Sequence, residues 1–409
     1  MKFLLVAKLA DWSRDRFKKK KRKVELKERN EVDRTGALLF VVNIDWFFLS
    51  HRLPIAIEAI RQGWQVHIAT GLTDRQHELE RHGLVVHPLQ LERAGVGIVN
   101  AISSAWQLLK IIRRVRPHVV HTVTIKPVLL GGMVARFAKV PSLVSAVPGL
   151  GSVFVADGLL ARLKRLLVRS GYRIALRHRN QKVIFQNTGD QDTVLSMTGL
   201  ASADVVLIRG SGADLTRFIP SPLPEGIPVV VLASRLLWNK GIQEFVSAAR
   251  LVRQRGVSAR FVLVGTPDAA SPTSVPKRQI EEWVSEGAIE WWGQRSDMEL
   301  VLAAANLVVL PSYSEGIPKI LIEAAACARP IVTTDVPGCR EAIEVGVTGV
   351  VVPCRDSTAL ANAIDQLLGD PAKCKLMGEA GRALAVREYD VVHVARAHLQ
   401  IYSDLKASA

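Results

Sequence analysis

Short apolar runs alternate with longer amphipathic segments along most of this chain. Residues 36–43 (GALLFVVN), 142–147 (SLVSAV) and 229–234 (VVVLAS) are typical of the runs, which are rich in Val, Leu and Ala and bounded by polar residues. Such runs are typical of buried strands, and the intervening segments carry the apolar spacing of helices. Regular alternation of the two predicts parallel sheets with helices on both faces.

The alternation occurs as two series of similar size. One extends from 36 to 209, the other begins at 229, and the Pro-rich segment SPLPEGIP at 221–228 separates them. A chain of 409 residues is long enough for two such domains. We therefore predict an α/β protein with two doubly wound, Rossmann-like domains that face one another across a cleft. Their ligand should lie between the facing carboxyl edges of the sheets.

We expect four segments along the chain. Residues 1–35 form a basic extension, 36–215 the first domain, 216–388 the second domain, and 389–409 a last helix that packs back on the first domain. Two interpretations of the extension remain: a solvated basic arm, or an anchor whose Phe3, Leu4, Leu5, Leu9 and Trp12 enter a membrane surface. An apolar run of five residues before Lys8, without a small-residue cleavage site, argues against a secretory signal.

Positive charge is concentrated in the first half of the chain. The net charge of +16 divides into +7 for residues 1–36 (13 Lys/Arg, 6 Asp/Glu), +11 for 37–209 (21 and 10) and −2 for 210–409 (20 and 22). We infer that the first half faces an anionic partner. On the predicted helix at 157–178, four arginines share one face and an apolar stripe occupies another: Arg162, Arg165, Arg169 and Arg173. An ordinary amphipathic helix packed on its sheet would also explain the apolar stripe.

Several classes of function receive little support. The four cysteines lie in the second half without a C-x-x-C pair, which argues against a disulfide framework or a structural zinc site. No metal-ligand spacing, Walker motif or G-x-G-x-x-G fingerprint is present. The tract KKKKRK at 18–23 resembles a basic interaction segment, but no nucleic-acid module accompanies it, and we predict no nucleic-acid partner. The longest uncharged stretch, 140–156, is broken by two prolines and two glycines and is not a membrane span.

The segment SEGIPKILIEAAACARPIVTTDVPGC at 314–339 combines two glutamates with a predicted helix start. The strand LVVLPS (307–312) precedes it, Pro318 suits the first helical position, and PIVTTD (330–335) is the next strand. Glu315 therefore lies in a loop at the carboxyl edge of a sheet, and Glu323 lies inside the helix. Free N–H groups in the first turn of a helix bind anions. A phosphate there, flanked by carboxylates that accept hydrogen bonds from hydroxyls, suggests a sugar nucleotide.

Two further segments carry candidate chemistry. In ASRLLWNKGI (233–242), Arg235 and Lys240 follow a strand and can neutralise a diphosphate, although solvated surface charges would give the same pattern. In HVVHTVTIKP (118–127), His121 is expected where a strand gives way to a loop. From this segment alone, a buried histidine with one satisfied nitrogen is the favoured interpretation.

These segments together resemble glycosyltransferase family 4, the retaining enzymes of GT-B fold. The resemblance covers about residues 37–405 and rests on SEGIPKILIEAAACARPIVTTDVPGCREAI, SRLLWNKGI, IRGSGADLTRF and GVTGVVVP. FFLSHRLP and HTVTIKP…VPGLGSVF resemble the branch that builds O-antigen, capsule or other lipid-linked glycans. Residues 1–35 have no counterpart in the usual pattern.

The resemblance implies a role for each matching residue. Arg235 and Lys240 would bind the donor diphosphate, Glu315 the donor sugar, and Glu323 the ribose, while His121 would contact the sugar from the opposite domain. The implied donor site comprises Arg235, Lys240, Glu315, Gly316, Ile317, Pro318, Lys319, Ile320 and Glu323, with backbone N–H groups of 317–320 around the phosphate. His121, Glu315, Arg235 and Lys240 would be catalytic. A weaker match assigns His51, Lys126, Gly149 and Gly151 to the acceptor.

The resulting expectation is a peripheral enzyme on the cytoplasmic face of the inner membrane. It would move a hexose or N-acetylhexosamine from a nucleotide sugar, with UDP as the expected nucleotide, to a polyprenyl-diphosphate-linked saccharide, without a required metal or cofactor. An anionic membrane surface would meet Lys18, Lys19, Lys20 and Lys21 and the four arginines of 162–173. The alternatives are a GT-B transferase with a soluble acceptor, a sugar-nucleotide epimerase, and a basic nucleic-acid-binding protein.

Overall fold

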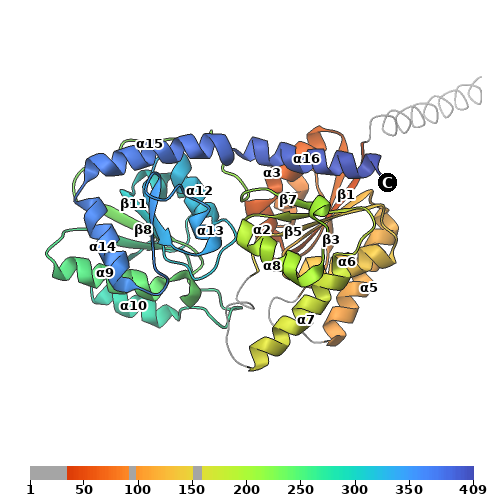
Figure 1. The fold of residues 1–409 in the computed structure, drawn as a ribbon, viewed down its shortest axis with the longest axis horizontal. Helices are drawn as coiled ribbons and strands as arrows, with labels where there is room; N and C mark the ends of the chain where they lie inside the picture. Colours follow the sequence, from red (N-terminus) through yellow and green to blue (C-terminus); the bar gives the residue numbers. More distant parts are fainter. Residues whose placement is uncertain (1–34, 92–97, 151–158) are drawn as a thin grey trace, which may run out of the picture.

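The computed structural model describes residues 35–91, 98–150 and 159–409. Two parallel sheets form the centres of two domains, which lie side by side in Figure 1. The first sheet has the order β3-β2-β1-β4-β5-β6-β7 and the second has β10-β9-β8-β11-β12-β13. In each sheet the order reverses beside the first strand of the domain, which is where doubly wound folds bind their ligands. The α/β, GT-B-like fold class is thereby confirmed.

The inner strands are almost wholly buried, because helices cover both faces of each sheet, whereas the edge strands are only partly buried. The first sheet comprises β1 (Gly36–Ile44), β2 (Trp64–Gly71), β3 (Val85–Pro88), β4 (Val119–Val123), β5 (Ser142–Val147), β6 (Gln181–Phe185) and β7 (Val205–Leu207). The second comprises β8 (Val229–Ala233), β9 (Arg260–Val264), β10 (Glu290–Trp291), β11 (Leu307–Leu310), β12 (Ile331–Thr334) and β13 (Gly349–Val352).

Helices connect successive strands in both domains. The first domain contains α2 (Asp45–His51), α3 (Leu53–Arg61), α4 (Gln76–Arg81), α5 (Ile98–Val115), α6 (Ile125–Phe137), α7 (Leu159–Ala175) and α8 (Thr188–Thr198). The second contains α9 (Ile242–Gln254), α10 (Lys277–Ser285), α11 (Met298–Ala303), α12 (Lys319–Ala326), α13 (Pro337–Arg340) and α14 (Ser357–Leu368). Short 3₁₀ turns occur at Ser202–Asp204 and Trp238–Lys240.

Helices α2 and α3 follow one another closely and are separated at Arg52. Pro54 lies in the first turn of α3. Because proline has no N–H and its ring clashes with the preceding turn, the chain starts a new helix there rather than continuing the old one.

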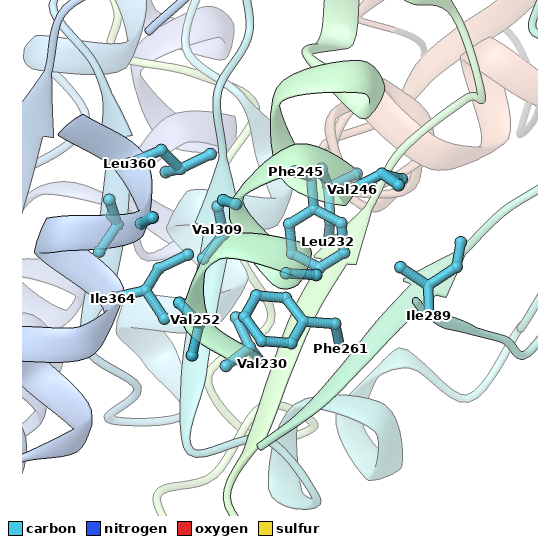
Figure 2. Close-up of a cluster of buried hydrophobic side chains, with 14 of the residues drawn as sticks. Val230, Leu232, Phe245, Val246, Val252, Phe261, Ile289, Val309, Leu360 and Ile364 are labelled. Atoms are coloured by element: carbon cyan, nitrogen blue, oxygen red, sulfur yellow. The ribbon is translucent and has the colours of Figure 1, made fainter. Parts of the chain in front are cut away.

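Each sheet face has its own apolar core. In the second domain, Phe245 and Val252 of α9 and Ile364 of α14 pack on Val230 and Val309 of the sheet (Figure 2). Burying each such side chain contributes about 1.5–3 kcal/mol relative to leaving it in water. These cores fix the strands, and therefore the loops at their carboxyl ends.

The last two helices join the domains along one side (Figure 1). Helix α15 (Pro371–Glu388) packs on α12 and α14, and α16 (Val391–Ala407) packs on α3, β4 and β5 of the first domain. Where the chain crosses back, the Ala213 N–H donates to the Tyr389 carbonyl at 2.8 Å and the Val391 N–H donates to the Ala213 carbonyl at 3.0 Å. The two crossover segments therefore run together between the domains.

Candidate active site

A cavity of about 580 Å³ opens where the carboxyl edges of the two sheets face one another. Its first-domain wall is formed by Trp46 and by residues 73–75 after β2. Its second-domain wall is formed by loops that follow β8, β9 and β10, and by one face of α12. The principal side chains on that wall are Arg235, Asp268, Gln294, Arg295 and Glu323.

Lys240 and Glu315 form an ion pair in loops that lead to or from lining residues of this cavity, and each side chain is 14% exposed. Lys240 belongs to the 3₁₀ turn after β8, and Glu315 belongs to the loop after β11, the neighbouring strand. Gly241 permits the close approach of these loops, since its φ is +73° and a Cβ there would lie 2.1 Å from the Pro311 carbonyl oxygen. The Tyr313 N–H also donates to the Asn239 carbonyl at 3.0 Å. The structure thus brings together two residues that sequence reasoning assigned to one site.

Arg235 lies on the cavity wall in the loop after β8, with about half of its side chain exposed. Its guanidinium Nη1 is 3.2 Å from Asp268 Oδ2. Asp268 was not expected from the sequence, because nothing local distinguishes it from a loop carboxylate. The pair leaves Arg235 at the cavity surface, where an anionic ligand can reach it.

Helix α12 begins at Lys319, with Pro318 as its N-cap rather than its first helical residue. The Ile317 N–H donates to Gln186 Oε1 of the first domain at 3.2 Å, and Pro318 has no N–H. Of the expected cradle over 317–320, the N–H groups of Lys319 and Ile320 are therefore the ones at the helix start that lack intrahelical acceptors. One turn on, Glu323 is buried and forms an ion pair with Lys319.

His121 does not lie at the site, contrary to the expectation. It occupies the middle of β4, and because strand side chains point to the faces of a sheet, it is directed into the core under α16. It is fully buried, and its Nδ1 is 2.6 Å from the Tyr402 hydroxyl. Burial, with the charges of His398 and Arg52, holds its pKa well below the usual value. The structure agrees with the interpretation that the segment alone favoured, a buried histidine with one nitrogen that is hydrogen-bonded.

Two of the expected acceptor residues lie near the donor residues. His51 ends α2, stacks on Phe47 with ring centroids 4.3 Å apart, and has a pKa lowered to about 3 by desolvation and then by the charges of Arg52, Lys319 and Arg235. Gly149 faces Gly316 so closely that a Cβ on it would lie 3.2 Å from the Gly316 nitrogen.

The remaining expected acceptor and membrane residues are distributed differently. Lys126 is in the first turn of α6, at the carboxyl edge of the first sheet. Arg165, Arg169 and Arg173 lie on α7, where Arg173 Nε donates to the Met197 carbonyl at 2.7 Å. Gly151, Lys18, Lys19, Lys20, Lys21 and the side chain of Arg162 are outside the described residues. Among helices in the part of the chain that the structure describes, none is long and apolar enough to cross a membrane.

Asp45 is a residue that sequence reasoning missed. It follows β1 and is fully buried, and its carboxylate accepts hydrogen bonds from the N–H groups of Trp46 at 2.7 Å and Thr73 at 2.6 Å. The Thr73 hydroxyl donates to it as well, at 3.0 Å. Asp45 therefore holds the loop that forms the first-domain wall of the cavity. An acid directly after the first strand was the only sequence signal.

Both domains match models of known families. Residues 37–187 match the family described as "Glycosyl transferase 4-like", and residues 227–370 match "Glycosyl transferases group 1". The chain belongs to the GT4-type glycosyltransferases. The matched ranges contain both sheets' switch points and the Lys240–Glu315 pair.

Individual relatives agree with this assignment. The chain is 28% identical over 377 residues to the N,N'-diacetylbacillosaminyl-diphospho-undecaprenol alpha-1,3-N-acetylgalactosaminyltransferase of Campylobacter jejuni, covering 87% of this chain and 97% of that one. The solved Anabaena protein HepE, in complex with UDP, superposes with a TM-score of 0.72 at 20% identity, covering 90% and 100%. Sucrose-phosphate synthase from Thermosynechococcus elongatus superposes with a TM-score of 0.74 at 21% identity, covering 91% and 100%. These structural similarities concern the fold.

Proposed function

We propose that this glycosyltransferase moves a hexose or an N-acetylhexosamine from a UDP-linked donor to a polyprenyl-diphosphate-linked saccharide, with retained anomeric configuration. The observation that carries the proposal is the Lys240–Glu315 pair, in which Glu315 belongs to the loop that leads into α12. Ile320 and Glu323 of that helix line the interdomain cavity, as does Arg235 of the loop that leads to Lys240. Cations, carboxylates and free N–H groups converge there from adjacent loops. A sugar diphosphate offers a complementary group to each of them.

The charges of this site are balanced in the absence of ligand. Lys240 pairs with Glu315, Lys319 with Glu323, and Arg235 with Asp268. A diphosphate that takes up the cations releases the carboxylates, which then accept hydrogen bonds from hydroxyl groups. Glu315 would thereby hold the transferred sugar, and Glu323, on the cavity wall, would hold the ribose.

Transfer requires that charge developing on the leaving diphosphate be stabilised. Arg235, Lys240 and the dipole of α12 supply fixed positive charge at that point, which is the largest contribution in many enzymes. An acceptor hydroxyl approaching the same face of the sugar forms the new bond as the bond to the diphosphate oxygen breaks, and its proton leaves with the diphosphate. The sugar then keeps its configuration.

The lipid-linked acceptor is supported by the name of the Campylobacter relative and by the charge of the first domain. Between residues 93 and 189 there are 16 Lys/Arg and one acid, Asp157, a net charge of +15. Helices α5, α6 and α7 of this segment also expose large apolar side chains: Val99, Ile102, Trp106, Met133, Phe137, Leu166, Leu167 and Ile174. A surface that is both basic and apolar suits an anionic bilayer. We propose that this face holds the enzyme, peripherally, at the cytoplasmic side of the cell membrane.

A donor and acceptor screen tests the proposal. UDP- and GDP-sugars are each added to the full chain, and the melting temperature is recorded, since a ligand that binds only the folded state raises stability. The stabilising donor is then incubated with a polyprenyl-diphosphate-linked saccharide and with the same saccharide free of lipid. We expect a UDP-sugar to stabilise and the lipid-linked acceptor to be the better substrate. Stabilisation by GDP-sugars alone, or equal transfer to the free saccharide, would contradict the donor or the acceptor assignment respectively.

A further inference from the structure

Several contacts cross from the first domain to the segment that carries Glu315. Gln186 Oε1 accepts a hydrogen bond from the Ile317 N–H at 3.2 Å. Nearby, the N–H and hydroxyl of Thr188 donate to the Glu341 carboxylate at 3.0 and 2.8 Å, where α8 meets α13 between the domains (Figure 1). The Gln186 contact differs from the second, because it reaches a backbone group only two residues from Glu315.

Gln186 itself is held on a rigid support. It directly follows β6, is 6% exposed, and precedes Asn187, the N-cap of α8. Asn187 is fully buried and exchanges two hydrogen bonds with Asp190, each 2.8 Å long. A strand end and a satisfied helix cap leave the Gln186 backbone little freedom. The Gln186 side-chain amide therefore extends from a rigid part of the first domain.

The segment around Gly316 and Ile317, which the Gln186 amide contacts, is tightly packed on both sides. A Cβ added to Gly316 would lie 1.6 Å from the Pro148 carbonyl oxygen and 2.8 Å from Gln186 Oε1. On the opposite side, a Cβ added to Gly338 would lie 1.3 Å from the Gly316 carbonyl oxygen. Backbone atoms of both domains thus press on residue 316, and the hydrogen bond at Ile317 fixes the orientation of the chain between Glu315 and α12.

We propose that Gln186 is a positioning residue, which sets Glu315 and the start of α12 relative to the acceptor-binding domain through its hydrogen bond to the Ile317 N–H. This inference rests on the proposed function of Glu315 in holding the donor sugar. The donor cations do not depend on it, because Lys240 and Arg235 belong to loops of the second domain. Loss of the contact should therefore impair transfer more than donor binding.

Two substitutions separate the hydrogen bond from the shape of the side chain. Gln186→Met keeps the length and removes the acceptor atom, whereas Gln186→Glu keeps an acceptor oxygen for the Ile317 N–H. Removal of a buried hydrogen bond weakens the contact, and misplacement of a reacting group adds to that loss. We expect Gln186→Met to lower kcat about tenfold, with KM for the donor and Kd for UDP changed less than about threefold. Gln186→Glu should recover most of the lost kcat.

Thr188→Val is the matched control, because it removes a hydroxyl from the other cross-domain contact and leaves Gln186 in place. We expect its kcat to stay within about threefold of the parent, because the Thr188 N–H still donates to Glu341. An equal loss in Thr188→Val and Gln186→Met would show that general domain closure, rather than Gln186, is responsible, and would overturn the proposal. Equal loss in the Met and Glu variants, or a parallel loss of UDP binding, would overturn it too.

Amide hydrogen exchange provides a readout that does not depend on transferase activity. The peptide spanning 312–322 should exchange faster in Gln186→Met than in the parent, because the Ile317 N–H loses its acceptor. Unchanged exchange would show that the hydrogen bond is not formed in solution, and the inference would fall. Faster exchange in Gln186→Met than in the parent, combined with no sugar transfer by the parent, would instead identify the proposed function as the statement in error.

Discussion

The Lys240 ammonium and the Glu315 carboxylate pair with one another although 75 positions separate them in the sequence. They meet because β8 and β11, which precede their loops, are neighbours in the second sheet. Each removes part of the other's hydration, and the pair lies at the start of α12. Under the proposed function, the diphosphate sugar would contact both this cation and this carboxylate.

Removal of the Lys240, Glu315 or Glu323 side chain should impair sugar transfer severely. We expect Lys240→Ala, Glu315→Ala and Glu323→Ala each to lower kcat by about 10²-fold or more, the scale associated with loss of one electrostatic contact in a transition state. Lys277→Ala is the matched control, since the Lys277 side chain on α10 is 68% exposed. Circular dichroism should show that all four variants are folded. Near-normal turnover of the Lys240 or Glu315 variant would contradict the proposed roles of these side chains in transfer.

The double variant Lys240→Ala/Glu315→Ala tests whether the two side chains act as a unit. Residues that act together lose activity non-additively, so the double variant should be little slower than the worse single variant. Steady-state kinetics of the four members of this cycle measure the coupling. A loss of kcat in the double variant equal to the product of the two single-variant losses would indicate independent roles and contradict the account.

Transfer should persist in excess chelator. Under the proposed function, Arg235, Lys240 and the N-terminus of α12 would supply the positive charge that a divalent cation would otherwise provide to the leaving group. The measurement compares initial rates in EDTA with rates in added Mg²⁺ or Mn²⁺. Complete loss in EDTA with full recovery in metal would assign the charge stabilisation to the ion rather than to these residues.

Stability should fall below neutral pH because of buried histidines. The His398 imidazole is 1% exposed, and burial, followed by the charge of Arg52, lowers its pKa from 6.5 to about 3. The unfolded chain takes up this proton below about pH 6.5 and the folded chain does not, so the free energy of unfolding decreases as the pH falls from about 6.5 toward 3. At pH 5 this single group accounts for about 2 kcal/mol.

Urea unfolding at pH 7.5 and pH 5 measures this effect in the parent and in His398→Phe. The variant cannot titrate at this position, so its free energy of unfolding should change by about 2 kcal/mol less between the two pH values. Comparing each protein with itself removes the constant cost of the substitution. Identical changes in the two proteins would show that His398 is not held neutral by the fold.

Membrane binding should depend on the basic first half. Each engaged Lys/Arg contributes about 1 kcal/mol near an anionic surface, within a Debye length. Deletion of residues 1–35, and replacement of Arg162, Arg165, Arg169 and Arg173 by Gln, should each weaken binding to anionic vesicles and raise KM for the lipid acceptor. UDP binding should not change in either variant.

The control for this experiment neutralises exposed cations of the second domain, Arg253, Arg278 and Lys375. Those substitutions should leave vesicle flotation unchanged at physiological salt. If the first-domain variants float as well as the parent, the positive charge of that half has another purpose.

Much of the fold could be predicted from local patterns. The apolar run SLVSAV, for example, predicts β5 with the bounds that the structure has. The proximity of Lys240 and Glu315 could be expected because both lie in loops that follow strands of the same parallel sheet. His121 was misplaced because its proximity to a predicted strand end said nothing of which face its side chain joins. The roles of Asp45 and Gln186 depend on partners 28 and 131 positions away, which no local pattern reveals.

The anomeric configuration of the product tests the central claim most directly. The full chain is incubated with the stabilising UDP-sugar and the polyprenyl-diphosphate-linked saccharide, and the one-bond and three-bond couplings of the new anomeric centre are read by NMR. The account predicts a product with the same configuration as the donor, formed by the parent and reduced about 10²-fold in Glu315→Ala. A product of inverted configuration, or equal product from the Glu315→Ala variant, would contradict it.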